Sequence, residues 1–141
     1  YVLKFPTEDK FLYTKKELCD KVTVLLAGRA SEEVFIGEVS TGASNDIKES
    51  TNIIYEIICS CGMGKNTQNT CIDERLIKYY LDTIKDEAQE MTSQAYDRAL
   101  SIIRENETLV DKIAQYLLKY ETMNAEKLDE LMDEFKNRAL I

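Results

Sequence analysis

The stretch that decides the fold is TKKELCDKVTVLLAGRASEEVFIG, which spans residues 14–37. Thr14 and Glu17 form a capping-box pattern, in which the hydroxyl accepts from an early helix amide and the glutamate reaches back to the cap. Gly37 provides a natural stop. The pattern therefore predicts a helix that begins after Thr14, continues through Glu33 and ends near Gly37. Its apolar positions recur at helical spacing: Leu18, Val22, Leu25, Leu26.

A second helix is predicted after the small, polar segment 40–44. Gly62 can end it as a left-handed cap, and residues 62–70 form a polar loop without periodicity. From about Ile72 the apolar spacing predicts one long helix, which Asn106 and Thr108 interrupt. Two further helices follow, and Asn124 caps the last one. The inner face of the second helix has four isoleucines: Ile47, Ile54, Ile57, Ile58.

These patterns together predict an all-α, helical bundle-like fold, with at most one short strand over residues 1–5. A chain of 141 residues suits one compact domain, so residues 1–141 are expected to form a single domain. The chain has only one proline and five glycines, so few residues interrupt regular structure. This composition favours long helices with few connections.

The charge and hydropathy of the chain argue against two classes of function. The chain has 26 acidic and 18 basic side chains and a net charge of −8, which argues against nucleic acid as a partner. No apolar run approaches the roughly 20 residues of a membrane span, so the chain itself is expected to be soluble. The first residue is Tyr1, which we interpret as the start of a fragment or processed product.

The absence of histidine is the strongest chemical observation. Without it, neither a Ser–His nor a Cys–His catalytic pair can be assembled. The segment from Gly62 to Lys65 lacks the remainder of a phosphate-binding loop. From its residues alone, the chain is a helical domain without a visible active site.

The four cysteines allow two interpretations. Cys59, Cys61 and Cys71 carry thiols, which can bind a soft metal ion, but their spacing matches no standard zinc finger. Cys59 and Cys61 also point to different sides of a helix. Reduced thiols in the core or on the surface are therefore the favoured interpretation, and the same holds for Cys19.

The segment STGASND, residues 40–46, places Asp46 in the first turn of the second helix. A carboxylate there is favoured by the helix dipole, and most such residues do nothing more. Arg29 and Glu33 leave three options open: an interhelical ion pair, a solvated face or support of a nearby site. Gly28 lies inside a predicted helix, so either a close backbone contact or poor local optimisation explains it.

Residues 25–37 and 40–47 resemble the FtsH family of membrane-anchored AAA+ zinc proteases. The family's pattern is L-L-G-G-R-A-A-E-E-x-x-F-G, then S-T-G-A-x-N-D-L, then a helix that closes with Y-G-M. Here the segments read LLAGRASEEVFIG and STGASNDI, and Cys61-Gly62-Met63 closes the helix. The match is dense over residues 11–64 and returns more loosely over 99–131. Two departures are Ala27, where the family has glycine, and a short loop at residues 62–70.

The resemblance implies a zinc site shared with residues outside this chain. In the family, two histidines of an H-E-x-x-H helix and the aspartate of the N-D-L segment hold the zinc, and the glutamate between the histidines is the general base. Asp46 matches the aspartate. Arg29, Glu33, Thr41 and Asn45 are expected to support that site or the structure around it. The H-E-x-x-H helix is expected upstream of Tyr1.

The implied function is that of an ATP-dependent zinc metalloendopeptidase, with this chain as the C-terminal portion of its peptidase domain. The expected cofactors of the parent protein are Zn²⁺ and ATP, and none is expected in this chain alone, which is predicted to be inactive. The implied partners are identical subunits in a hexameric ring and unfolded or membrane proteins as substrates. Membrane spans and an ATPase module are expected earlier in the parent, with this domain on the cytoplasmic or organelle-interior side.

Two alternatives stay open. The chain can be a non-catalytic relative that acts as an oligomerisation or adaptor domain, or a helical binding module unrelated to proteases. The second leaves the matched run from Leu25 to Asp46 unexplained.

Overall fold

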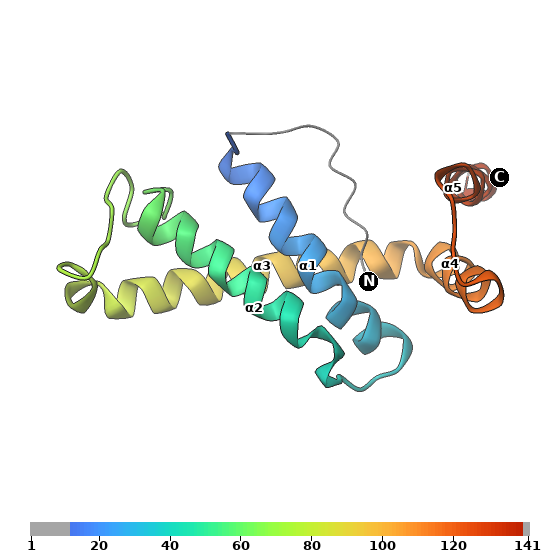
Figure 1. Ribbon diagram of the computed structural model, residues 1–141, viewed down its shortest axis with the longest axis horizontal. Helices are drawn as coiled ribbons and strands as arrows, with labels where there is room; N and C mark the ends of the chain where they lie inside the picture. The colour runs from blue at the N-terminus through green and yellow to red at the C-terminus, as the bar shows by residue number, and fades with distance from the viewer. Residues whose placement is uncertain (1–11, 140–141) are drawn as a thin grey trace.

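The structure, a computed structural model, describes residues 12–139. They form five α-helices with short turns and one longer loop between them (Figure 1). The predicted all-α class is confirmed, and these described residues contain no strand. The strand predicted for residues 1–5 lies outside the described residues.

Helix α1 spans Lys15–Phe35 and follows the predicted boundaries. The Glu17 amide donates to the Thr14 hydroxyl at 3.1 Å, and the Thr14 amide donates to the Glu17 carboxylate at 3.1 Å. The capping box is thus complete. At the other end Gly37 has a φ of +79°, a conformation that glycine adopts without strain.

Helix α2, Ser44–Tyr55, continues into a π-helical turn over Glu56–Ser60. The predicted left-handed end is confirmed, because Gly62 has a φ of +60°. Ile54, Ile57 and Ile58 are all fully buried. The buried polar residue of this helix is Ser50, while Thr51 is exposed and its hydroxyl donates to the Ile47 carbonyl.

The prediction of a helix from Ile72 was wrong, because α3 begins only at Leu81 and spans Leu81–Glu105. Ile72 is buried in a non-helical segment, and its amide donates to the Cys59 carbonyl at 2.8 Å. The Asp73 carboxylate then accepts from the Arg75 amide at 3.0 Å, which forms a local turn. Residues 72, 76, 80 and 84 mimic a helix face in sequence although the backbone between them turns.

Helix α3 is amphipathic, with Ile84, Ala95 and Leu100 buried and Lys85 exposed. It forms the long axis of the molecule, and α1 and α2 cross it on one side (Figure 1). Within residues 12–139, no helix is both long enough and apolar enough to traverse a bilayer.

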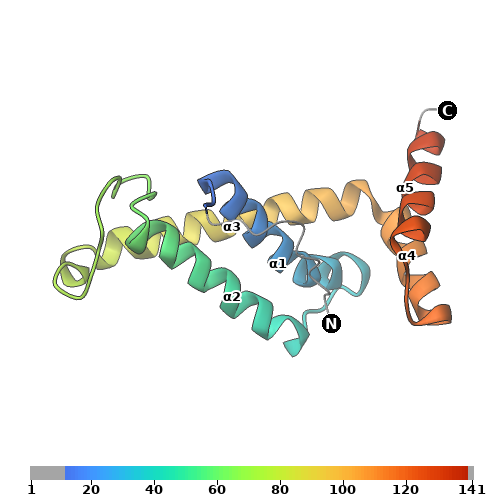
Figure 2. The same ribbon diagram turned by 45° about the horizontal axis from the view of Figure 1, so that its top comes forward.

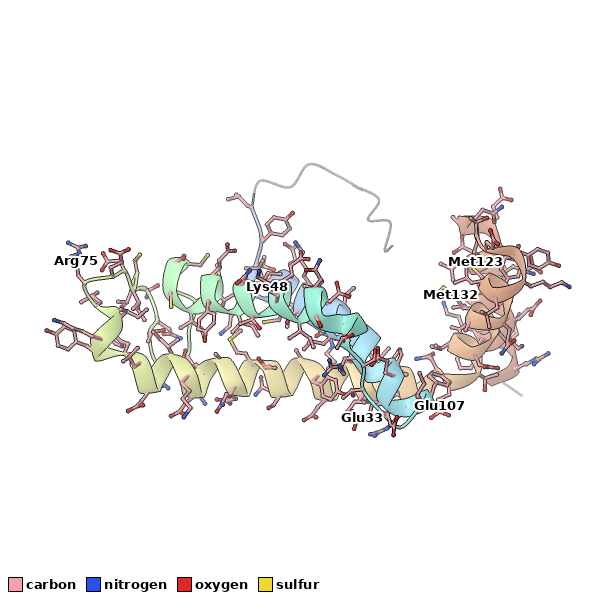
Figure 3. All side chains as sticks on the ribbon, turned by 60° about the horizontal axis from the view of Figure 1, so that its bottom comes forward. Glu33, Lys48, Arg75, Glu107, Met123 and Met132 are labelled. Carbon is pink, nitrogen blue, oxygen red and sulfur yellow. The ribbon has the colours of Figure 1, made fainter. Side chains whose placement is uncertain are left out.

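Helices α4, Glu107–Tyr120, and α5, Ala125–Ala139, form a hairpin at one end of α3 (Figure 2). Asn124 caps α5 as predicted, since its side-chain oxygen accepts from the Lys127 amide at 2.8 Å. Leu131 of α5 is buried, and Figure 3 shows Met123 and Met132 in this same unit. Helix α4 ends at Tyr120, and the next residue, Glu121, has a φ of +65°.

The main core lies where α1 meets α2 and α3. A smaller cluster of Ala30, Ala99 and Leu100 continues the contact between α1 and α3. The two alanines allow the two helices to approach closely near the end of α1. The main core consists of ten buried side chains: Val22, Leu25, Leu26, Ile53, Ile54, Ile57, Ile58, Ile72, Ile84, Ala95.

Two glycine substitutions should have opposite effects. A Cβ on Gly62 would lie 3.1 Å from backbone atoms of Asn69 and Thr70, at a positive φ. Gly62→Ala should therefore lower the free energy of unfolding by about 1–3 kcal/mol. Gly28→Ala should raise it by about 0.5–1 kcal/mol, because a Cβ on Gly28 meets nothing within 4 Å. Urea unfolding followed by circular dichroism measures both, and equal stability of the two variants would contradict this account.

Candidate metal-ligand site

Asp46 lies in the first turn of α2 and is partly exposed. Ala43, at the N-cap position, provides no side-chain cap, so the positive end of the helix dipole faces the aspartate without a competing side chain. Among residues 12–139, no side chain or amide hydrogen-bonds or ion-pairs with the Asp46 carboxylate. Both of its oxygens therefore have lone pairs available for a ligand.

The turn before Asp46 is held by Glu32 of α1. The Ser40 amide donates to Glu32 Oε2 at 2.7 Å, and the Ser40 hydroxyl donates to Glu32 Oε1 at 2.8 Å. The Ser40 hydroxyl also accepts from the Gly42 amide at 3.1 Å. The hydrogen bonds from the Ser40 amide and hydroxyl lower the pKa of the Glu32 carboxyl, and the nearby Arg29 charge adds to the effect. A charged glutamate thus fixes the chain just before α2. We call Glu32, Ser40 and Arg29 the Ser40 clamp.

Arg29 completes the clamp, because its Nη2 donates to the Ser40 carbonyl at 3.1 Å. Its Nε is buried without an acceptor among the described residues. Arg29 thus binds a backbone carbonyl 11 residues away, and it forms no ion pair with an acidic side chain of the described residues. Its support of a nearby site stays a prediction.

Glu33 faces in a different direction from Glu32. It accepts a hydrogen bond from the Tyr96 hydroxyl of α3, and Figure 3 shows it at the end of α1. Burial and this hydrogen bond raise the pKa of Tyr96 to about 12. Glu33 therefore joins α1 to α3. No local pattern in the sequence links Glu33 to Tyr96, which is 63 residues away.

Thr41 and Asn45 flank the clamp. The short 3₁₀ helix Thr41–Ala43 precedes α2, and the Thr41 carbonyl accepts from the Ser44 hydroxyl at 2.6 Å. Asn45 is exposed beside Asp46. A Cβ on Gly42 would lie 3.2 Å from the Ser40 hydroxyl oxygen, so the tight turn favours glycine at this position.

Glu32 and Ser40 are the residues of the candidate site that sequence reasoning missed. The sequence placed Glu32 beside Glu33 without distinguishing them. Helical geometry alone separates the two faces by about 100°, but only the tertiary contacts reveal which face meets the turn. No local signal links Glu32 to Ser40, which is eight residues away.

One face of α1 has an open strip near the start of its contact with α2. Lys21 Nζ and Glu49 Oε1 lie 4.0 Å apart and join the two helices, which run in opposite directions (Figure 1). Residues three, four and seven apart share a helix face, so Val24 and Gly28 lie on the face of α1 that carries Lys21. Val24 is 67% exposed. Because a Cβ on Gly28 meets nothing within 4 Å, no described residue makes the close contact that would explain this glycine.

The chemistry of the donors limits what the described residues can hold. No group of three or more histidine, cysteine, aspartate or glutamate side chains converges within residues 12–139. Cys59, Cys61 and Cys71 are free thiols and do not form a metal cluster. Asp46 fits the role of a single carboxylate ligand, and a tetrahedral zinc site needs further donors.

The chain also matches a known protein family. The model of peptidase family M41 matches residues 1–131, which includes α1, the Ser40 clamp and Asp46. The chain belongs to peptidase family M41.

Its relatives in this family include ATP-dependent zinc metalloproteases. The FtsH 2 protein of Thermoanaerobacter sp. (strain X514) is 42% identical over 134 residues, which cover 95% of this chain and 26% of that protein. FtsH of Thermotoga maritima is 36% identical, with 95% and 24% covered. FtsH of Bacillus subtilis is 36% identical, with 94% and 23% covered. The chain spans about a quarter of the length of these M41 relatives.

The Ser40 clamp should make stability depend on pH. The pKa of Glu32 is lower in the folded state than its ordinary value of 4.5. The charged carboxylate therefore contributes fully to the free energy of unfolding above pH 4.5, and this contribution is lost as pH falls through the lowered pKa. Glu32→Gln should therefore be less stable than the wild type at neutral pH, and the difference should shrink in acid. Urea unfolding across a pH series measures both.

The matched control is Glu38→Gln, which changes an exposed carboxylate close to the same turn. It should leave the stability at neutral pH close to that of the wild type. If Glu32→Gln were as stable as Glu38→Gln at neutral pH, the clamp would not contribute to the fold.

Proposed function

We propose that this chain is the C-terminal, helical part of the peptidase domain of an ATP-dependent zinc metalloendopeptidase. The observation that supports it most directly is Asp46, a carboxylate without a described partner, placed after a turn that Glu32 and Ser40 hold. Membership of family M41 and the names of the relatives point to the same chemistry. In this proposal residues 1–141 form one domain of the parent protein.

Asp46 would provide one oxygen ligand to the zinc, which when bound polarises a peptide carbonyl and activates water. The remaining protein ligands would be two histidines of an H-E-x-x-H segment outside this sequence. The open strip of Val24 and Gly28 supports this arrangement, because it leaves room for another helix to pack against α1. Arg29 and Thr41 would act through the backbone that positions Asp46, and Glu33 through the contact with α3. Asn45 would lie at the rim of the site.

We further propose that the parent protein uses ATP to deliver unfolded or membrane proteins to this domain. It would do so as a hexameric ring of identical subunits, anchored by membrane spans elsewhere in the parent. This domain would then lie on the cytoplasmic or organelle-interior side.

A second candidate is a non-catalytic oligomerisation or adaptor domain. The observation in its favour is the apolar exposure on α4, where Leu118 is 79% and Tyr120 54% exposed. This role does not need Asp46, so variants of that residue distinguish the two candidates.

Asp46→Asn in the full-length parent should abolish cleavage of an unfolded protein such as casein and lower the bound zinc, measured by elemental analysis. The amide keeps the shape of the side chain, so the fold should lose no more than about 1 kcal/mol from the helix dipole. Glu38→Gln is the control and should cleave normally. Full cleavage and zinc content in Asp46→Asn would contradict the peptidase role of this residue.

The isolated 141-residue chain should neither retain stoichiometric zinc nor cleave casein, since it contains no histidine. Elemental analysis after dialysis against a weak chelator measures the zinc. Stoichiometric zinc that is lost in Asp46→Asn would contradict this expectation, because the chain would then assemble a complete site by itself.

A further inference from the structure

Two free cysteines meet where the loop between α2 and α3 begins and ends. Cys59 lies in the π-helical turn Glu56–Ser60, and Cys71 follows the loop at residues 62–70. The Ile72 amide donates to the Cys59 carbonyl at 2.8 Å. Standard backbone dimensions then place the Cα atoms of Cys59 and Cys71 within about 8 Å of each other. The Cα atoms of disulfide-bonded cysteines are roughly 4.4–6.8 Å apart, so a small movement suffices to join these two residues.

A second backbone hydrogen bond keeps the two ends of this loop together. The Asn69 amide donates to the Gly62 carbonyl at 2.8 Å. Gly62 lies three residues after Cys59, and Asn69 lies three residues before Ile72, so the two segments run side by side in opposite directions. The backbone therefore holds Cys59 and Cys71 near each other without any contribution from their side chains.

The two thiols also influence each other electrostatically. Burial is the largest cause that raises the pKa of the Cys59 thiol, the neighbouring Cys71 thiol is the next, and Glu87 adds to the effect. Cys61 is two residues from Cys59 in a helical turn, so the side chains of these two cysteines do not face each other. Cys71 is thus the cysteine whose sulfur approaches that of Cys59.

The two sulfurs differ in their access to solvent. Cys59 is half-buried and packs against the main core, whereas Cys71 is exposed. Oxidants react with the thiolate form of cysteine, and an exposed thiol ionises and meets them more readily than a thiol that burial keeps neutral. Cys71 is therefore suited to react first with an oxidant, and Cys59 is suited to attack the oxidised sulfur afterwards.

We propose that Cys59 and Cys71 form a reversible redox site, which hydrogen peroxide oxidises to a disulfide bond. The Cys71 thiolate attacks one peroxide oxygen, the O–O bond breaks, and the sulfur becomes a sulfenic acid while the other oxygen leaves as water. The Cys59 thiolate then attacks that sulfur, and the departing hydroxide takes up the proton of the second thiol. Two thiols and one peroxide thus give one disulfide and two waters, because the sulfurs lose the two electrons that the peroxide gains. This site does not depend on the metal-ligand role of Asp46.

The disulfide bond closes a loop that contacts α3. The Asn66 amide donates to the buried Glu87 carboxylate of α3. Lys65 and Gln68 of the same loop line a pocket of about 470 Å³ between the loop, α1 and α3. In the reduced chain, backbone hydrogen bonds hold the two ends of the loop together. A covalent bond at the same place prevents these ends from separating, so oxidation fixes one wall of the pocket.

Peptide mapping of the 141-residue chain tests the pairing. The reduced chain is treated with hydrogen peroxide, the remaining thiols are blocked with iodoacetamide, and trypsin digests the product for mass spectrometry. A disulfide bond between Cys59 and Cys71 should join the peptide of residues 49–65 to that of residues 66–75, and dithiothreitol should separate them. Cys61→Ser is the matched control and should keep this cross-link, whereas Cys59→Ser and Cys71→Ser should each lose it.

The oxidised chain should also unfold less readily than the reduced chain. Because the bond closes the loop in the unfolded state as well, the equilibrium constant for unfolding should fall by at least about tenfold. Urea unfolding before and after oxidation measures this change, and Cys71→Ser should show none of it. A cross-link that persists in Cys59→Ser, no cross-link at all, a disulfide-linked dimer as the main product, or equal stability of the oxidised and reduced chains would each overturn the proposal.

Discussion

The structure depends on the burial of one side of α1 against both α2 and α3. Val22, Leu25 and Leu26 lie between the isoleucines of α2 and the apolar face of α3. Each fully buried side chain of this size contributes roughly 1.5–3 kcal/mol relative to an exposed one. Helices α2 and α3 also contact each other directly, and Ile72 from the segment between them joins the same core.

The same helix fixes the start of α2 by polar means. Glu32 lies one residue before Glu33, and the two carboxylates bind partners on different elements, Ser40 and Tyr96. One pair of adjacent glutamates thus orients α1 towards the turn before Asp46 and towards α3. A candidate ligand held in this way loses little conformational entropy when it binds, which is the physical reason for placing it after a rigid turn.

The loop between α2 and α3 is tied down mainly by backbone and buried polar contacts. Gly62 turns the chain, Ile72 is anchored on Cys59, and Glu87 accepts from the Asn66 amide. The resemblance indicated that this loop is shorter than usual for the family. In the structure the short loop packs against α3 and forms one wall of the pocket that contains Lys65.

The sequence by itself determined the helix type, the Thr14 capping box, the glycine stops and the family, because these depend on neighbours within a few residues or on a contiguous motif. It also singled out Asp46 as a candidate ligand through the resemblance, and that role stays a prediction. It placed the start of α3 too early, because residues spaced by four cannot distinguish a helix from a turn that buries the same side chains. Tertiary structure alone decided the partners of Glu32, Glu33 and Glu87. Those partners lie 8, 63 and 21 residues away, and hydrogen bonds over such separations leave no periodic signal in the chain.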